Sequence, residues 1–106
     1  MKITLTKDAD KFLCIIYKDF LQRRKSGLSK SEAKEFDEDY HLTNSDFYQW
    51  HQDDIDESKM ELGQKGLVHI WMGGSFYIED NGIIYMESRF KNGLKEMIDI
   101  VSKFIP

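Results

Sequence analysis

Apolar residues recur along most of this chain at the spacing of amphipathic helices, and one short segment has the pattern of paired strands instead. Between Lys7 and Lys25 the apolar positions cover a wide face, which predicts a helix central to the core. Thr6 is suited to be its N-cap, and Gly27 is suited to end it in a left-handed conformation. The apolar positions of this helix are Ala9, Phe12, Leu13, Ile16, Phe20 and Leu21, with Cys14, Ile15 and Tyr17 beside them.

A second helix is predicted by a capping signal. Ser29 and Glu32 have the spacing of a capping box, in which each residue bonds the backbone N–H of the other. A short helix is therefore expected over residues 30–37, with Ala33 and Phe36 as its core contacts.

Two segments have weaker patterns. Residues 3–5 alternate between apolar and polar side chains, which is typical of a short edge strand. Residues 38–51 carry few apolar anchors, and only a short helix or turn over residues 46–50 is expected there.

The most specific pattern lies between residues 53 and 78. A helix predicted over 53–65 ends at Gly66, and two β-prone runs then flank the pair Gly73-Gly74. Because glycine adopts positive φ without steric cost, this pair predicts a two-residue hairpin turn. The expected order is helix, strand, tight turn, strand.

Residues 81–88 allow two predictions, because Asn81-Gly82 suits a second hairpin turn before a third strand, while the following residues lead into a helical pattern. The clearest amphipathic helix follows over residues 91–104. Its apolar face comprises Leu94, Met97, Ile98, Val101, Phe104 and Ile105, with Ile100 at the edge of the face.

This order of elements, with the exit Lys65-Gly66-Leu67-Val68, resembles the third helix and wing of a winged-helix domain. Short winged-helix proteins encoded by bacteriophages and their prophages are similar, including an ending like Phe104-Ile105-Pro106. The resemblance implies an α+β fold, a helical core with a small antiparallel β-hairpin wing, over residues 7–89. Residues 90–106 add a C-terminal amphipathic helix to one domain, 1–106. The resemblance also favours a helix over residues 81–88, because a similar Gly-Ile pattern opens a helix in winged-helix relatives.

Length and cysteine content indicate the number of domains and the cellular location. A chain of 106 residues has the size of one domain. Its single cysteine, Cys14, cannot form an internal disulfide and lies in the most apolar helix, where a thiol is unreactive. A reducing, cytoplasmic location is expected, because no segment has the apolar length of a signal peptide or of a membrane span.

The net charge of −4 is unevenly distributed. Residues 1–30 carry eight Lys and Arg against three Asp and Glu, whereas residues 31–62 carry two against eleven. In winged-helix proteins that bind DNA the third helix enters the major groove, but here that helix is acidic and the wing tip lacks Lys and Arg, which disfavours DNA. The candidate nucleic-acid contacts are Arg23, Arg24, Lys25, Lys30 and Lys34, although a helix C-terminus followed by a solvated face explains them more simply.

The sequence predicts neither an enzyme nor a cofactor or metal site. It lacks a nucleophile elbow and a phosphate-binding glycine loop. His51, Asp53 and Asp54, with His41 upstream, have the chemistry of metal ligands, but a solvated helix start is by far the better account of them. His69 lies between Val68 and Ile70 and is expected to point away from their face.

Interface-forming side chains are the remaining candidates. Trp71, Met72 and Tyr77 on the wing belong to residue types enriched in protein interfaces, although packing in the core is slightly favoured for each of them taken singly. Ile100 widens the apolar face of the last helix. The sequence therefore predicts a small, non-enzymatic binding or regulatory module that acts by protein–protein contact. The partner is another protein or a second copy bound through the C-terminal helix, and the alternative is a DNA-binding winged-helix regulator.

Overall fold

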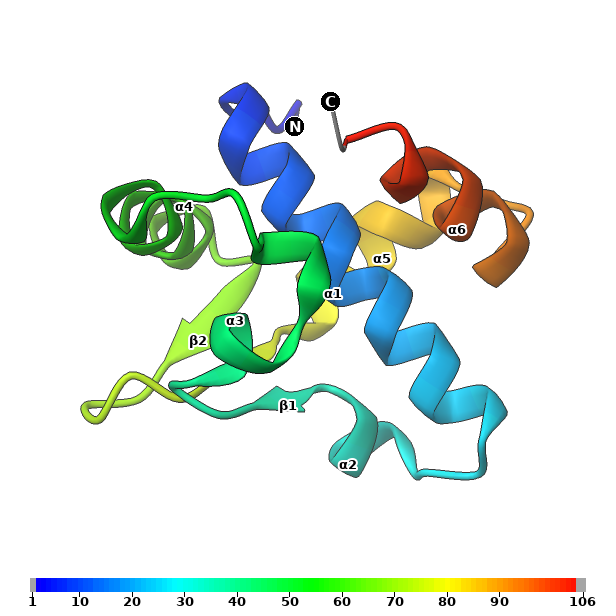
Figure 1. Ribbon diagram of the computed structural model, residues 1–106. Helices are drawn as coiled ribbons and strands as arrows, with labels where there is room; N and C mark the ends of the chain where they lie inside the picture. The colour runs from blue at the N-terminus through cyan, green and yellow to red at the C-terminus, as the bar shows by residue number, and fades with distance from the viewer. Residues whose placement is uncertain (1, 105–106) are drawn as a thin grey trace.

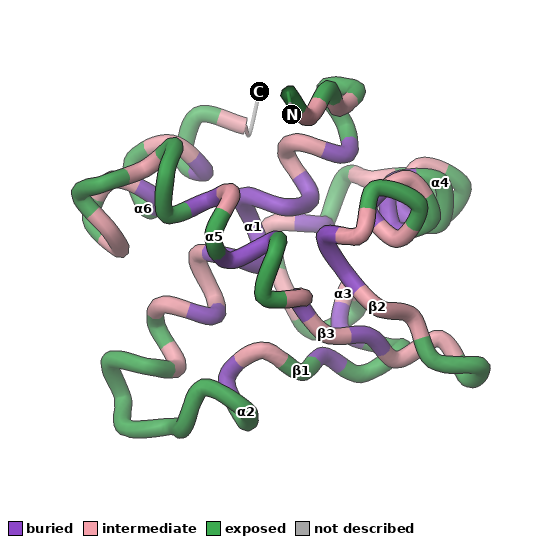
Figure 2. Tube along the Cα trace, turned by 180° about the vertical axis from the view of Figure 1, so that it is seen from behind, coloured by how far each residue is buried: buried purple, intermediate pink, exposed green. Residues whose placement is uncertain are grey.

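A computed structural model describes residues 2–104. Helix α1 (Lys7–Lys25) crosses the middle of the molecule, with α4 and the sheet on one side and α6 on the other (Figure 1). Its start is as predicted, since the Thr6 hydroxyl accepts a hydrogen bond from the Ala9 N–H. Its middle is buried over consecutive positions, as expected for a helix covered on several sides (Figure 2).

The second predicted helix is shorter than expected. The capping box of Ser29 and Glu32 is present, but α2 (Lys30–Ala33) ends after one turn and β1 (Glu35–Phe36) follows. The chain leaves the helix because the Lys34 carbonyl accepts a hydrogen bond from the Ile78 N–H, which draws this segment to the sheet. Phe36 is buried as predicted, although from a strand. The predicted strand at residues 3–5 is wrong, and β1 occupies the edge of the sheet instead.

The segment before the third long helix contains two short elements. The turn predicted over 46–50 is the 3₁₀ helix η1 (Ser45–Phe47), while α3 (Tyr40–Thr43) was not predicted. Tyr40 anchors α3, because its hydroxyl donates to the Asp19 carboxylate and accepts from the Asn44 side-chain amide.

Helix α4 (Gln52–Gln64) leads into strands β2 (Val68–Ile70) and β3 (Phe76–Ile78), as predicted. The antiparallel sheet has the order β1-β3-β2. The predicted two-residue turn is wrong: the Trp71 N–H bonds the Ser75 carbonyl, so three residues form the loop. Of Gly73 and Gly74, only Gly74 has a positive φ. This fits a three-residue loop in which a turn is followed by one residue in the left-handed conformation.

The open question at residues 81–88 is resolved as a helix, α5 (Asp80–Arg89). Helix α6 (Leu94–Ser102) is shorter than the predicted 91–104, because Gly93 at φ 68° separates it from α5. Met97 and Val101 are fully buried and α6 packs on α1. Ile105, assigned to the same face, lies outside the described residues.

Cys14 is buried in α1, as the sequence predicted, and its environment makes folding dependent on pH. Burial, and secondarily the Asp10 carboxylate, raises the pKa of the thiol from 9.0 to about 12. Above pH 9 the unfolded chain releases this proton while the folded chain retains it. Cys14 therefore contributes a loss of stability as pH rises from about 9 towards about 12, with a limiting slope of about 1.4 kcal/mol per pH unit.

Urea unfolding of the wild type and of Cys14→Ala across this pH range checks the prediction. The raised pKa values of Tyr17 and Tyr40 add a loss of the same sign above their ordinary value of 10.0, and both proteins share it. The difference between the two pH profiles therefore isolates the thiol. Identical pH dependence in both proteins would show that the buried thiol does not resist ionisation.

Candidate interaction surface

The side chains of the sheet lie on two faces, one packed on the core and one exposed to solvent. Val68 and Phe76 point to the core and are buried, and the intervening positions of the same strands point outward. The hairpin of β2 and β3 is called the wing below. His69 and Tyr77 occupy its outward positions, and the Trp71 ring packs on both of them. Together with Met72, the exposed loop residue that follows Trp71, they form a surface that we call the wing aromatic face: His69, Trp71, Met72 and Tyr77. The sequence analysis identified three of these residues and predicted the outward direction of His69.

The rings of this face pack on one another. The centroid of the His69 ring lies 4.5 Å from that of Trp71 and 5.1 Å from that of Tyr77, and the Trp71 and Tyr77 centroids are 5.9 Å apart. Trp71 still has 53% of its surface exposed, Met72 is fully exposed, and Tyr77 is half-buried. The aromatic side chains thus support each other while leaving a wide apolar area in water.

A lysine from α4 holds the wing from the core side. The Lys59 ammonium lies 3.4 Å from the Gly74 carbonyl oxygen and 4.8 Å from the centroid of the Phe76 ring. The residue is buried, and this desolvation lowers the pKa of Lys59. Lys59 is therefore not one of the outward cations of α4, and the exposed side of that helix is more acidic than the sequence suggests.

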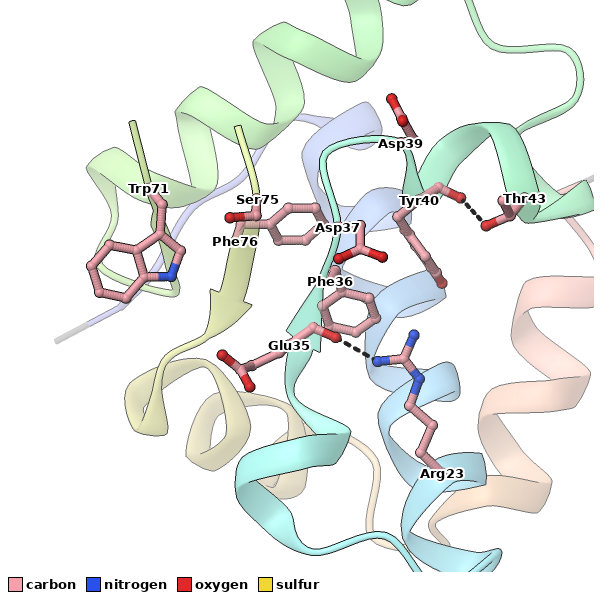
Figure 3. A pocket seen from close by; sticks show the side chains of 10 residues that line it. All are labelled: Arg23, Glu35, Phe36, Asp37, Asp39, Tyr40, Thr43, Trp71, Ser75 and Phe76. Carbon is pink, nitrogen blue, oxygen red and sulfur yellow. Dashed lines mark hydrogen bonds between the residues drawn. The ribbon is translucent and has the colours of Figure 1, made fainter. Parts of the chain in front are cut away.

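A hollow of about 330 Å³ opens between β1, α3 and the base of the wing. Figure 3 shows the side chains around it, with Trp71 and Ser75 at the wing side. Glu35, Asp37 and Asp39 line it and are exposed, and we call it the acidic hollow. Within residues 2–104 none of these three carboxylates takes part in an ion pair.

The acidic hollow and the wing aromatic face form one continuous surface. Trp71 belongs to both, because it lines the hollow and packs on His69. Glu38 extends the negative charge towards the wing tip: a Cβ atom placed on Gly74 would lie 3.3 Å from the Glu38 Cβ. Sequence reasoning missed this hollow, because its walls come from segments that only the folded sheet brings together.

Comparisons of the chain with family models, with curated proteins and with solved structures find no match. In the described part of the chain, no three His, Cys, Asp or Glu residues are grouped so that they could hold a metal ion. His51 precedes α4 and is exposed, and His41 belongs to α3. Among residues 2–104, no helix combines the length and the apolar character needed to cross a membrane.

Arg23, the first candidate for nucleic-acid contact, has a structural position. Its guanidinium donates to the Glu35 carbonyl at 2.6 Å and to the Ala33 carbonyl at 3.3 Å. It also lies 4.5 Å from the centroid of the Phe36 ring. Arg23 thus attaches β1 to α1, and its substitution would disturb the sheet edge whatever the protein binds.

The other basic candidates are divided between bound and free positions. Lys30 pairs with Asp80 at 3.0 Å, which lowers the pKa of that carboxyl, and Lys34 lies 5.0 Å from the centroid of the Tyr77 ring. Arg24 and Lys25 are exposed at the end of α1, where Arg24 also donates to the Leu28 carbonyl. These basic side chains therefore do not form a single free patch that could contact a nucleic acid.

The apolar edge of α6 is not where the sequence placed it. Ile100 is partly buried against the core, whereas Ile98 has 46% of its surface exposed. The buried face is rotated relative to the prediction because α6 packs on α1 through Met97 and Val101. Ile98 is therefore the exposed apolar side chain of this helix.

Proposed function

We propose that this protein is a small, non-enzymatic binding module of winged-helix type that acts by contact with another protein. The observation that carries the proposal is the display of Trp71 and Met72 in solvent on a wing that Lys59 holds in place. Exposed aromatic and methionine side chains on an ordered surface are typical of interface centres, where burying them releases water from apolar area.

The order of elements supports the winged-helix type. Helix α4 leads directly into β2, a turn and β3, in the way that the third helix of that family leads into its wing. Strand β3 lies in the middle of the sheet, so that β1 adds a third strand to the hairpin of β2 and β3.

Photo-crosslinking at the wing tests the proposal. A photoreactive residue at Met72 is expected to give a discrete crosslinked product in an extract of the native cells, and Trp71→Ala in the same chain is expected to abolish it. The matched control is the same residue at Tyr48, which is 85% exposed, follows η1 in the chain and does not line the hollow beside Trp71. Equal products from both positions, or products indifferent to Trp71→Ala, would contradict a specific wing interface.

The alternative, DNA binding, is expected to be weak. At physiological salt the affinity for random duplex should be no tighter than the roughly 10⁻⁴–10⁻⁶ M of non-specific binding, because few free cations oppose an acidic α4. Fluorescence anisotropy measures this. Arg24→Glu with Lys25→Glu is the informative variant, since Arg23 has a structural role. Tighter binding that this double variant abolishes would favour DNA.

Self-association through α6 is a further prediction. Ile98→Glu is expected to weaken a dimer without loss of the fold, because Ile98 is exposed, whereas Ile100→Glu should also destabilise the monomer. Sedimentation at high micromolar concentration measures the association. If the wild type sediments as a monomer at this concentration, self-association is contradicted, and packing on α1 alone explains the apolar face of α6.

A further inference from the structure

We infer that the wing aromatic face and the acidic hollow together bind a segment of the partner that carries an arginine or lysine. The cationic group enters the hollow beside Trp71, and the apolar neighbours of that residue lie on Met72 and the aromatic rings. The inference rests on the proposed function and adds the chemistry of the partner.

Charge complementarity selects this occupant. The hollow holds three carboxylates, from Glu35, Asp37 and Asp39, against one guanidinium, from Arg23. That guanidinium is turned to the Glu35 backbone carbonyl and the Phe36 ring, so it does not pair with the carboxylates around it (Figure 3). The surplus of negative charge favours a cation and opposes an acidic segment.

The aromatic wall adds a second attraction for the same group. Trp71 lines the hollow, and a cation above an indole face is attracted by the charge distribution of the ring. A guanidinium can pair with a carboxylate in two places and stack on a ring at the same time, which an ammonium cannot do. Arginine is therefore the preferred residue of the partner, and lysine the weaker substitute.

Substitution of Asp37 and Asp39 tests this inference and is expected to leave the fold intact. Both side chains are exposed, and within the described residues neither accepts a hydrogen bond. Asp37→Asn with Asp39→Asn removes two charges and keeps the shape. Glu57→Gln with Glu87→Gln removes the same charge from exposed positions that do not line the hollow, and serves as the matched control.

The experiment selects binders to the wild-type protein from a displayed library of short random peptides. We expect enrichment of peptides with one arginine or lysine beside apolar residues. Their binding should fall about tenfold or more with Asp37→Asn and Asp39→Asn, and also when citrulline replaces the arginine, since citrulline keeps the shape without the charge. The control pair should change binding by less than about twofold.

The possible outcomes separate the two claims. Peptides whose binding depends on Trp71 but not on their own charge or on Asp37 and Asp39 would overturn this inference and leave the proposed function standing. A selection that yields no peptide dependent on Trp71 would contradict the proposed function, and the inference with it. Enrichment of acidic peptides would contradict the charge argument directly.

Discussion

Replacing Gly82 by alanine is expected to destabilise the protein by about 3 kcal/mol, although the residue lies inside a helix where alanine is normally favoured. A Cβ atom at this position would lie 2.3 Å from the Leu67 carbonyl oxygen and 2.9 Å from the Ile78 Cγ2 atom. The first of these is backbone, so no rotation of a side chain relieves the overlap. Helix α5 would have to move away from the start of β2.

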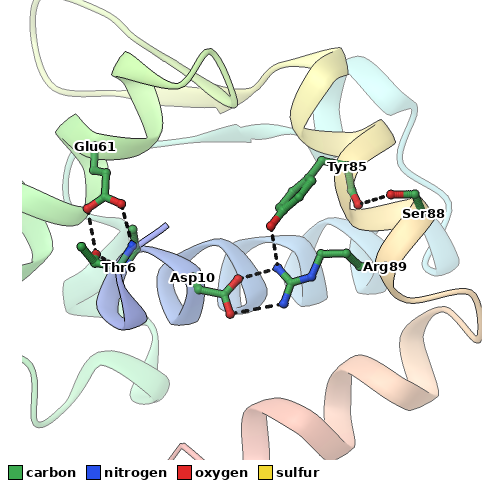
Figure 4. Close-up of polar contacts among 7 residues, drawn as sticks. Thr6, Asp10, Glu61, Tyr85, Ser88 and Arg89 are labelled. Carbon is green, nitrogen blue, oxygen red and sulfur yellow. Dashed lines mark hydrogen bonds and ion pairs between the residues drawn. The ribbon is translucent and has the colours of Figure 1, made fainter. Parts of the chain in front are cut away.

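That movement is opposed by contacts at the other end of α5. The Arg89 guanidinium binds the Asp10 carboxylate on α1 and lies 3.3 Å from the Tyr85 hydroxyl (Figure 4). In the same figure Glu61 accepts two hydrogen bonds from Thr6, which ties α4 to the start of α1. The helices are thus fixed on both sides of the overlap, and the strain remains in the folded state.

Gly63→Ala is the matched control. Its Cβ atom would lie 3.3 Å from Ile70 Cδ1, the end of a side chain that can shift, and the helical preference of alanine offsets the remaining strain. Urea denaturation should show a large fall in midpoint for Gly82→Ala and a change of less than about 1 kcal/mol for Gly63→Ala. Equal stabilities of the two variants would show that α5 does not approach the backbone of Leu67 as described.

Gly82 also shows where prediction from the sequence ends. The pair Asn81-Gly82 has the same local pattern at a hairpin turn as at the start of a helix, and a resemblance was needed to choose between them. The reason for glycine is a contact with Leu67, which is distant in the sequence. Local propensity carries no information on such an approach.

Elements with strong local signals were predicted well. Helix α1 has its N-cap at Thr6, and the capping box begins α2 at the expected residue. Strand β1 and the end of α2 were missed because Phe36 joins the sheet by pairing with Phe76, a tertiary interaction that overrides a helical tendency. The burial of Lys59 beneath the wing was not predicted either, because it depends on contacts with Gly74 and Phe76.

The interaction surface was predictable in part. Alternation along the first strand predicted that His69 points away from the face of Val68 and Ile70, and residue type made Trp71 and Tyr77 interface candidates; the structure places the three rings together. The acidic hollow depends on how β1 and α3 meet the wing, which no spacing in the sequence reveals. Arg23 was grouped with its basic neighbours because charge alone does not show that a guanidinium is bound to backbone carbonyls.

The largest expected effect on binding is that of Trp71→Ala. The affinity for a protein partner captured through Met72 should fall by about thirtyfold, equivalent to about 2 kcal/mol, because a central tryptophan loses its buried area and its contact with the partner's cation. The fold should be unaffected, since Trp71 is mostly exposed.

Leu42→Ala is the control for this effect, because Leu42 is also exposed but lies on α3 outside the wing aromatic face. Titration calorimetry with the captured partner compares the three proteins. A loss of affinity shared by both variants would indicate general damage, and no loss for Trp71→Ala would remove the wing from the interface.

The most direct measurement is the fluorescence of Trp71 on binding. Trp50, the other tryptophan, packs on Phe12 and Phe47, and Trp50→Phe leaves Trp71 as the only indole. If the wing aromatic face is the binding surface, adding the captured partner should shift the emission to shorter wavelength and reduce quenching by acrylamide. Saturating partner that leaves the emission and the quenching of Trp71 unchanged would contradict binding through the wing.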